Sequence, residues 1–169
     1  SHQPKLNDGD YEMTKKDPYI IKKPEISKAI YSTLSGNEHF YKIDSKQSFK
    51  MYAGITVAKI DECPNAFDKF SFSILNSNFE EIINFNGEAF EWWSWYEEYG
   101  KQWYWVGPEF GSEFQSTTTF DKGIYYIRVY NSDNLGNYVL ATGDIEKFNP
   151  LVIGKMLIVL PKINKKFWN

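Results

Sequence analysis

Five glutamates in the middle of the chain have side chains that could do acid-base chemistry. They are Glu91, Glu97, Glu98, Glu109 and Glu113. A glycosidase uses two carboxyl groups on either side of the scissile bond, and their separation sets the stereochemical outcome. Adjacent residues on a strand point to opposite faces, so Glu97 and Glu98 cannot flank one bond. The spacing favours solvated surface acids over a glycosidase-like centre, and we predict no catalytic residue.

Nucleophilic and metal chemistry would depend on Cys63 and His39. Cys63 is the only cysteine, and it stands in a polar loop before Pro64 without a recognisable nucleophile signature. A single cysteine excludes an intramolecular disulfide and a multi-cysteine metal cluster. We interpret Cys63 as a bystander thiol and His39 as a hydrogen-bonded or exposed side chain.

The segment from Asn131 to Asn137 offers oxygen atoms to a hard cation, but Asp133 is its only carboxylate. Calcium loops close with a bidentate glutamate, which this segment lacks, so a hairpin turn is the favoured interpretation. Neither a phosphate-binding loop nor a GxSxG nucleophile elbow occurs. We therefore expect no cofactor and no metal.

Residues 90–105 hold five of the six tryptophans. Three interpretations are open: a strand–turn–strand whose rings fill the core, a protein-contact patch, or a platform that stacks on sugar rings. Alternate side chains of a strand point to opposite faces, so at least some of these rings must be core. The candidate contact residues are Trp92, Trp93, Trp95, Tyr96, Trp103 and Trp105.

The C-terminal segment differs chemically from the rest of the chain. Residues 151–160 are apolar except at Gly154 and Lys155, and this run is about half of the roughly 20 residues that span a bilayer. It predicts either a short element packed on the domain or a segment that lies against a membrane surface. For the second case, the candidate membrane-proximal residues are Lys162, Lys165, Lys166 and Trp168.

Composition limits the function further. The net charge is −3, and Arg128 is the only arginine. Proteins that read nucleic acids need clustered positive charge for phosphates and arginine for base edges, so nucleic acid is not an expected partner.

The elements that position these residues are expected to be strands. The 169 residues fit one domain, and the 18% of aromatic residues favours sheet. Short strands are predicted around a turn at 29–44, at 69–75 with one face buried, and at 124–130 and 138–142 as a closing hairpin. We predict an N-terminal arm (1–25), an all-β sandwich of antiparallel strands (26–146) and a short apolar, basic C-terminal extension (147–169).

Two segments carry a family resemblance. The stretch Gly123 to Tyr130, followed by Gly136 to Leu140, resembles the closing hairpin of bacterial pre-peptidase C-terminal domains, and residues 29–43 resemble their opening hairpin. The resemblance implies a jelly-roll-like β-sandwich attached to secreted or surface proteins. His39 stands where the family usually has aspartate, so the calcium sites of some members are not carried over.

These observations together predict a non-enzymatic interaction module. We expect it to be extracellular, periplasmic or on the cell surface, as the soluble part of a larger membrane-associated protein, with a membrane anchor in the full-length protein as an option. The expected partner is a protein or a glycan, with membrane proximity through the C-terminal extension as a further option. The alternative function is a carbohydrate-binding module that uses the Trp-rich segment 90–105.

Overall fold

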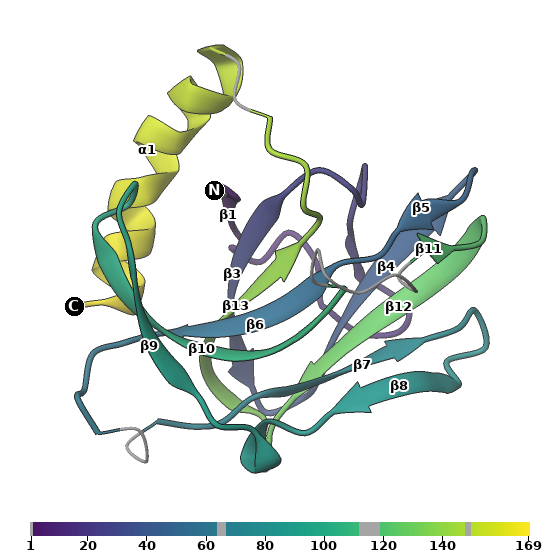
Figure 1. Cartoon of the computed structure of the whole chain (residues 1–169), viewed down its shortest axis with the longest axis horizontal. Coiled ribbons are helices and arrows are strands. Elements are labelled where there is room, and N and C mark those ends of the chain that lie inside the picture. Colours follow the sequence, from purple (N-terminus) through teal and green to yellow (C-terminus); the bar gives the residue numbers. More distant parts are fainter. Residues whose placement is uncertain (1, 64–66, 112–118, 148–149) are drawn as a thin grey trace.

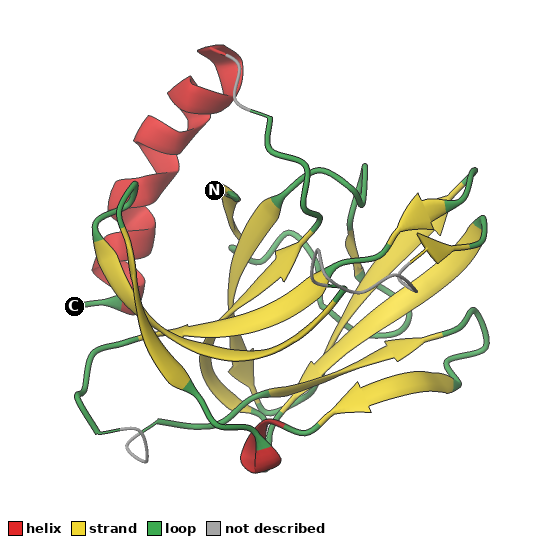
Figure 2. Ribbon diagram, in the orientation of Figure 1, coloured by secondary structure: helices red, strands yellow, loops and turns green. Residues whose placement is uncertain are grey.

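The structure is a computed structural model of the chain, and it describes residues 2–63, 67–111, 119–147 and 150–169. Two β-sheets face each other, and one long helix lies outside them (Figures 1 and 2). The strands are β1 (Gln3–Leu6), β2 (Tyr19–Ile20), β3 (Lys28–Ser35), β4 (His39–Ser45), β5 (Phe49–Lys50), β6 (Ala53–Ala58), β7 (Ser71–Leu75), β8 (Glu81–Phe85), β9 (Trp93–Glu97), β10 (Gln102–Phe110), β11 (Thr119–Phe120), β12 (Gly123–Tyr130) and β13 (Leu135–Thr142). The helices are the 3₁₀ turn η1 (Gly87–Ala89) and α1 (Pro150–Phe167).

The first sheet has six strands in the order β1-β3-β13-β6-β10-β9, and the second has five in the order β2-β4-β12-β7-β8. Strands β5 and β11 form a small third sheet. Apolar side chains from both large sheets meet between the layers. The six-stranded sheet contributes Ile30, Leu34, Ile55, Val57, Trp105, Tyr138 and Leu140, and the five-stranded sheet contributes Tyr41, Ile43, Phe72, Ile74, Ile127 and Val129. The prediction of a mostly β chain with sandwich-like layers is confirmed.

The sheets are mixed, not antiparallel as predicted. β1 runs parallel to β3, and β2 runs parallel to β4. Both parallel partners come from the first 25 residues, which lie along one edge of each sheet. The same segment, predicted as an arm, also places Met13 and Ile21 in the core, each with 3% of its surface exposed.

The opening hairpin expected at 29–44 and the closing hairpin expected at 124–142 do not form. β3 lies in the six-stranded sheet and β4 in the five-stranded one, and β12 and β13 are divided in the same way. The turn between β12 and β13 is closed by Asn131, whose side chain bonds both the N–H and the carbonyl of Leu135. The chain therefore crosses between the layers at both turns. The sequence positions of two strands are the same whether the turn between them makes a crossing or a hairpin, so the sequence pattern did not distinguish the two.

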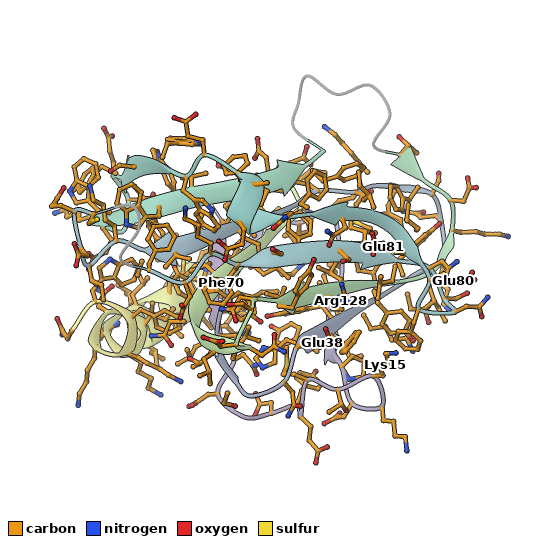
Figure 3. All side chains as sticks on the ribbon, turned by 90° about the horizontal axis from the view of Figure 1, so that it is seen from below. Lys15, Glu38, Phe70, Glu80, Glu81 and Arg128 are labelled. Carbon is orange, nitrogen blue, oxygen red and sulfur yellow. The ribbon has the colours of Figure 1, made fainter. Side chains whose placement is uncertain are left out.

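β7 is buried on both faces, not on one face as the alternation predicted. Its outward serines are covered: Ser71 Oγ accepts a hydrogen bond from the N–H of Gly87 (2.8 Å), and Ser73 Oγ donates to Asn84 Oδ1 (2.8 Å). Arg128 donates to the same Ser73 Oγ (3.1 Å) and pairs with Glu38 at 3.7 Å. Figure 3 shows Arg128 and Glu38 side by side, with Phe70 among the side chains between the layers.

The C-terminal extension is a helix packed on the outer face of the six-stranded sheet. Met156, Ile163 and Phe167 of α1 are buried. Ile163 and Phe167 join Tyr31, Tyr104 and Val139 of the sheet in a second apolar cluster. α1 lies beside the β9–β10 hairpin in Figure 1, and the Gln102 side chain donates to Asn164 Oδ1 at 3.3 Å.

Candidate functional site

The Trp-rich segment forms the β9–β10 hairpin, which agrees with the strand–turn–strand that was one of the three open interpretations, and its turn lies at 98–101. The register pairs Tyr104 with Trp95 and Val106 with Trp93. Glu97 stabilises the turn, because its carboxylate accepts hydrogen bonds from the N–H groups of Tyr99 (3.0 Å) and Gly100. Since neighbouring residues alternate, Trp93, Trp95 and Tyr104 share one face of the hairpin, while Tyr96, Trp103 and Trp105 share the other.

Two of the six candidate contact residues are core residues. Trp92 and Trp105 are 6% and 5% exposed. Phe67 stacks on Trp105, with ring centroids 5.4 Å apart, and meets Trp92 edge to face at 5.3 Å. The Trp92 indole donates to the carbonyl of Gly87 at 2.9 Å, so its polar atom is also satisfied. These two rings hold the hairpin to the sandwich.

Tyr96 and Trp103 form a second aromatic pair, on the same hairpin face as Trp105. Their ring centroids are 5.2 Å apart, and both rings are partly exposed. Lys59 Nζ lies 5.2 Å from the Trp103 centroid and donates to Ser94 Oγ at 3.0 Å. A cation over an aromatic face is attracted by the ring quadrupole, so Lys59 steadies this side of the hairpin.

The opposite hairpin face opens onto a hollow across the outer face of the six-stranded sheet. The registers bring Ala29, Ala141 and Gly54 into one row across three neighbouring strands. A second row places Tyr31, Val139, Thr56 and Val106 side by side. The first row has no side chain larger than a methyl group, and this makes the floor of a groove.

The groove walls come from α1 and from the hairpin. Met156, Leu160 and Ile163 line it from the helix, and Trp93, Trp95 and Tyr99 line it from the hairpin. The cavity has a volume of about 260 Å³, near the lower end of the range for small-ligand sites. Trp93, Trp95 and Tyr99 are 51%, 41% and 57% exposed, so they leave flat apolar surface for a partner.

The polar groups of the groove are largely hydroxyl groups and amides. The Tyr31 and Tyr104 hydroxyl oxygens lie 2.5 Å apart, and Tyr52 donates to Glu109 at 2.8 Å. Burial raises the pKa of Tyr104 to about 12 and that of Tyr31 well above its ordinary value. These hydroxyls are therefore protonated at neutral pH and can orient a ligand by hydrogen bonding.

The glutamates that border the groove stand far apart. Glu97 pairs with Gln102 at one end of β10, and Glu109 lies opposite Gly54 at the other. These two positions are seven residue steps apart on the strand, or about 20 Å, whereas the two acids of a glycosidase are within about 10 Å of each other. Glu91 and Glu98 are exposed, and Glu113 lies outside the described residues.

His39 and Cys63 are placed differently from each other. Cys63 is exposed, while His39 is buried and its Nδ1 lies 2.7 Å from the Tyr138 hydroxyl. Tyr138 in turn bonds Tyr41 at 2.6 Å, and burial lowers the pKa of His39 to about 4. His39 is thus a neutral member of a buried polar network. In the part of the chain that the structure describes, no three His, Cys, Asp or Glu side chains are grouped to hold a metal.

The candidate membrane-proximal residues divide into two groups. Lys162, Lys165 and Lys166 are exposed on α1. Trp168 turns to the domain: its indole donates to the carbonyl of Trp103 (3.1 Å), and its ring meets Tyr104 at 5.2 Å. Within the described ranges, no helix combines the length and apolar character needed to cross a bilayer.

The groove floor is the part of the site that sequence reasoning missed. Ala29, Gly54 and Ala141 are unremarkable in the sequence, because single small residues in separate segments form no motif. They form a groove floor only because the strand register places them in one row. The signal available in the sequence was an Ala or Gly two residues away from Tyr31, Thr56 or Val139, on the same strand face.

No protein-family model matches the sequence, and no curated protein matches it significantly.

Proposed function

We propose that this domain is a non-enzymatic interaction module that holds its partner in the groove between α1, the β9–β10 hairpin and the six-stranded sheet. The observation that carries the proposal is the row of Ala29, Ala141 and Gly54, which lines the same hollow as the half-exposed Trp93 and Trp95. A sheet face turned to solvent ordinarily carries polar side chains. A face that is hollow and rimmed by tryptophan is suited to binding.

The favoured partner is a protein segment that inserts apolar side chains. The helix wall is aliphatic, with Met156, Leu160 and Ile163, and the hairpin wall is aromatic. Buried tryptophan and tyrosine contacts dominate the binding energy of protein interfaces. The Tyr31 and Tyr104 hydroxyls and the Gln102 amide can bond the backbone of such a segment.

A peptide array tests this proposal with two matched double variants. Trp93→Ala with Trp95→Ala removes the groove rim, while Tyr96→Ala with Trp103→Ala removes the same kind of surface from the opposite hairpin face. We expect the first pair to lower the affinity of array-selected peptides at least tenfold and the second to leave it within about twofold. Far-UV circular dichroism confirms that both fold.

Two results would contradict the groove as the binding site. One is an equal loss of affinity in both double variants. The other is retention of affinity in Trp93→Ala with Trp95→Ala and its loss in the opposite pair, which would move the site to Tyr96 and Trp103.

A carbohydrate-binding module is the second candidate. It is favoured by the half-exposed rings of Trp93, Trp95 and Tyr99, which lie near Glu109 and Gln102 at the groove. Aromatic rings suit the apolar faces of sugars, and carboxylates and amides suit their hydroxyl groups. Titration of tryptophan emission with a panel of soluble polysaccharides tests this function. It fails if no glycan shifts the emission.

We also propose that the domain is exported or displayed on the cell surface, as the soluble part of a larger membrane-associated protein, and that its topology is of the jelly-roll kind. The support is the resemblance of residues 29–43 and 123–140 to pre-peptidase C-terminal domains. The two crossings between layers, at β3–β4 and β12–β13, suit a fold of two packed sheets. An encoded export signal upstream or a spanning helix downstream would support this compartment, and a natural protein confined to the cytosol would contradict it.

A further inference from the structure

The helix α1 has a second apolar face that the sheet does not cover. Leu151, Leu157 and Ile158 are 67%, 72% and 68% exposed. Residues seven apart lie on the same side of a helix, so Leu151 and Ile158 are aligned, with Leu157 beside them. The face buried against the sheet is a different one, formed by Met156, Ile163 and Phe167.

Positive charge surrounds this exposed face. Residues 150–169 contain four lysines, Lys155, Lys162, Lys165 and Lys166, and no acidic residue. All four lysines are exposed. Lys5 of β1 lies close enough to Lys155 for the two charges to interact, and the pKa of Lys5 is lowered by burial first and by Lys155 second. The surroundings of α1 are therefore basic, although the whole chain is acidic.

We propose that α1 lies on the surface of an anionic membrane. Leu151, Leu157 and Ile158 enter the boundary between headgroups and acyl chains, while the flanking lysines reach anionic headgroups. An amphipathic helix binds a bilayer surface through buried apolar area together with attraction to anionic lipid. Long lysine side chains can keep their ammonium groups at headgroup level while the helix sits lower.

Charge also decides against a second copy of the chain as the occupant. Two α1 helices packed through this face would bring lysines against lysines with no acidic residue on either helix. Like charges at close range disfavour such an interface, whereas anionic lipid neutralises them. The proposal does not depend on the groove, which lies on the other side of the helix.

Sedimentation with vesicles tests the proposal on the full chain. The probes are vesicles of phosphatidylcholine alone and vesicles that also contain phosphatidylglycerol. We expect binding to the anionic vesicles to exceed binding to the neutral ones at least tenfold, and to fall as salt is raised. Leu157→Glu with Ile158→Glu should abolish the binding. Replacing Lys155, Lys162 and Lys165 with Gln should lower it about fivefold per lysine.

The control is Ile82→Glu, which places one negative charge of the same kind on an apolar side chain of β8 that is 48% exposed. It should bind anionic vesicles like the original chain, and circular dichroism should show all variants folded. Equal binding to both vesicle types, or unchanged binding by the Leu157→Glu and Ile158→Glu variant, would overturn the proposal. A concentration-dependent dimer, seen by light scattering without vesicle binding, would assign this face to a second copy instead.

Discussion

The indole nitrogen of Trp168 donates a hydrogen bond to the main-chain carbonyl of Trp103, over a distance of 3.1 Å. This bond joins the residue that directly follows α1 to the β9–β10 hairpin, and both α1 and the hairpin form walls of the groove. The Trp168 ring also meets Tyr104 edge to face, on the sheet face that the helix covers. The groove therefore depends on a contact between residues 65 positions apart.

Removing the donor of this bond should loosen the helix. Trp168→Phe keeps an aromatic ring against Tyr104 but has no N–H group, so we expect a loss of about 0.5–1 kcal/mol in the free energy of unfolding. Amide hydrogen exchange of residues 150–167 should become faster. The control is Trp103→Phe, which alters the ring but keeps the accepting carbonyl. Unchanged exchange in Trp168→Phe would show that α1 is held without this bond.

The tryptophans of the hairpin should differ sharply in their importance for folding. Trp92→Ala leaves a hole against Phe67 and should cost about 3–5 kcal/mol of the free energy of unfolding. Trp93→Ala removes a half-exposed ring and should cost about 1 kcal/mol or less. Chemical denaturation measures both values. Similar losses for the two variants would mean that Trp93 is as buried as Trp92.

Two glycines offer a further matched pair. A Cβ atom at Gly107 would lie 2.4 Å from the Trp92 ring, so Gly107→Ala should destabilise the chain by about 1–3 kcal/mol. A Cβ atom at Gly154, within α1, would meet nothing within 4 Å. Gly154→Ala should therefore raise the stability of the helix by about 0.5–1 kcal/mol, through better helix propensity. Thermal unfolding distinguishes these opposite shifts, and a stabilising Gly107→Ala would contradict the close packing of Trp92.

Strand positions could be predicted from the sequence because alternation is a local property. The strands predicted at 39–44, 69–75 and 124–130 were found in this way. The distribution of strands between sheets could not be predicted, since a crossing between layers and a hairpin need similar turns. At the crossing from β12 to β13, the Asn131 side chain closes the turn by bonding the N–H and the carbonyl of Leu135.

The candidate site was predicted in part. The Trp-rich hairpin was identified, and alternation correctly required some rings to be core. The identity of the core rings depends on which side of the hairpin faces the second sheet. Trp92 and Trp105 lie on that side and pack against Phe67. The groove floor depends on the three strands β3, β13 and β6 in register, so no single segment contains its signal.

The buried histidine should make stability depend on pH. The pKa of His39 is lowered from 6.5 to about 4 by burial, so the unfolded chain takes up a proton before the folded chain does. The neutral His39 therefore contributes up to about 3 kcal/mol to the free energy of unfolding above about pH 6.5. This contribution is lost as the pH falls toward about 4.

The variant His39→Asn tests this dependence, because an Asn amide reaches the position of Nδ1 but does not titrate in this range. The free energy of unfolding, measured between pH 4 and 7, should fall less steeply in His39→Asn than in the original chain. His2, whose pKa is also lowered to about 4, contributes equally to both and cancels in the comparison. Parallel curves for the two proteins would contradict a buried, neutral His39.

The most direct test of the groove as the binding site is the nuclear magnetic resonance spectrum of the six indole N–H groups, recorded with array-selected peptides or glycans. The account predicts that the signals of Trp93 and Trp95 shift on binding, while those of Trp92 and Trp105 stay in place. Shifts confined to Trp103, or no shift at Trp93 and Trp95 with a ligand that binds, would contradict it.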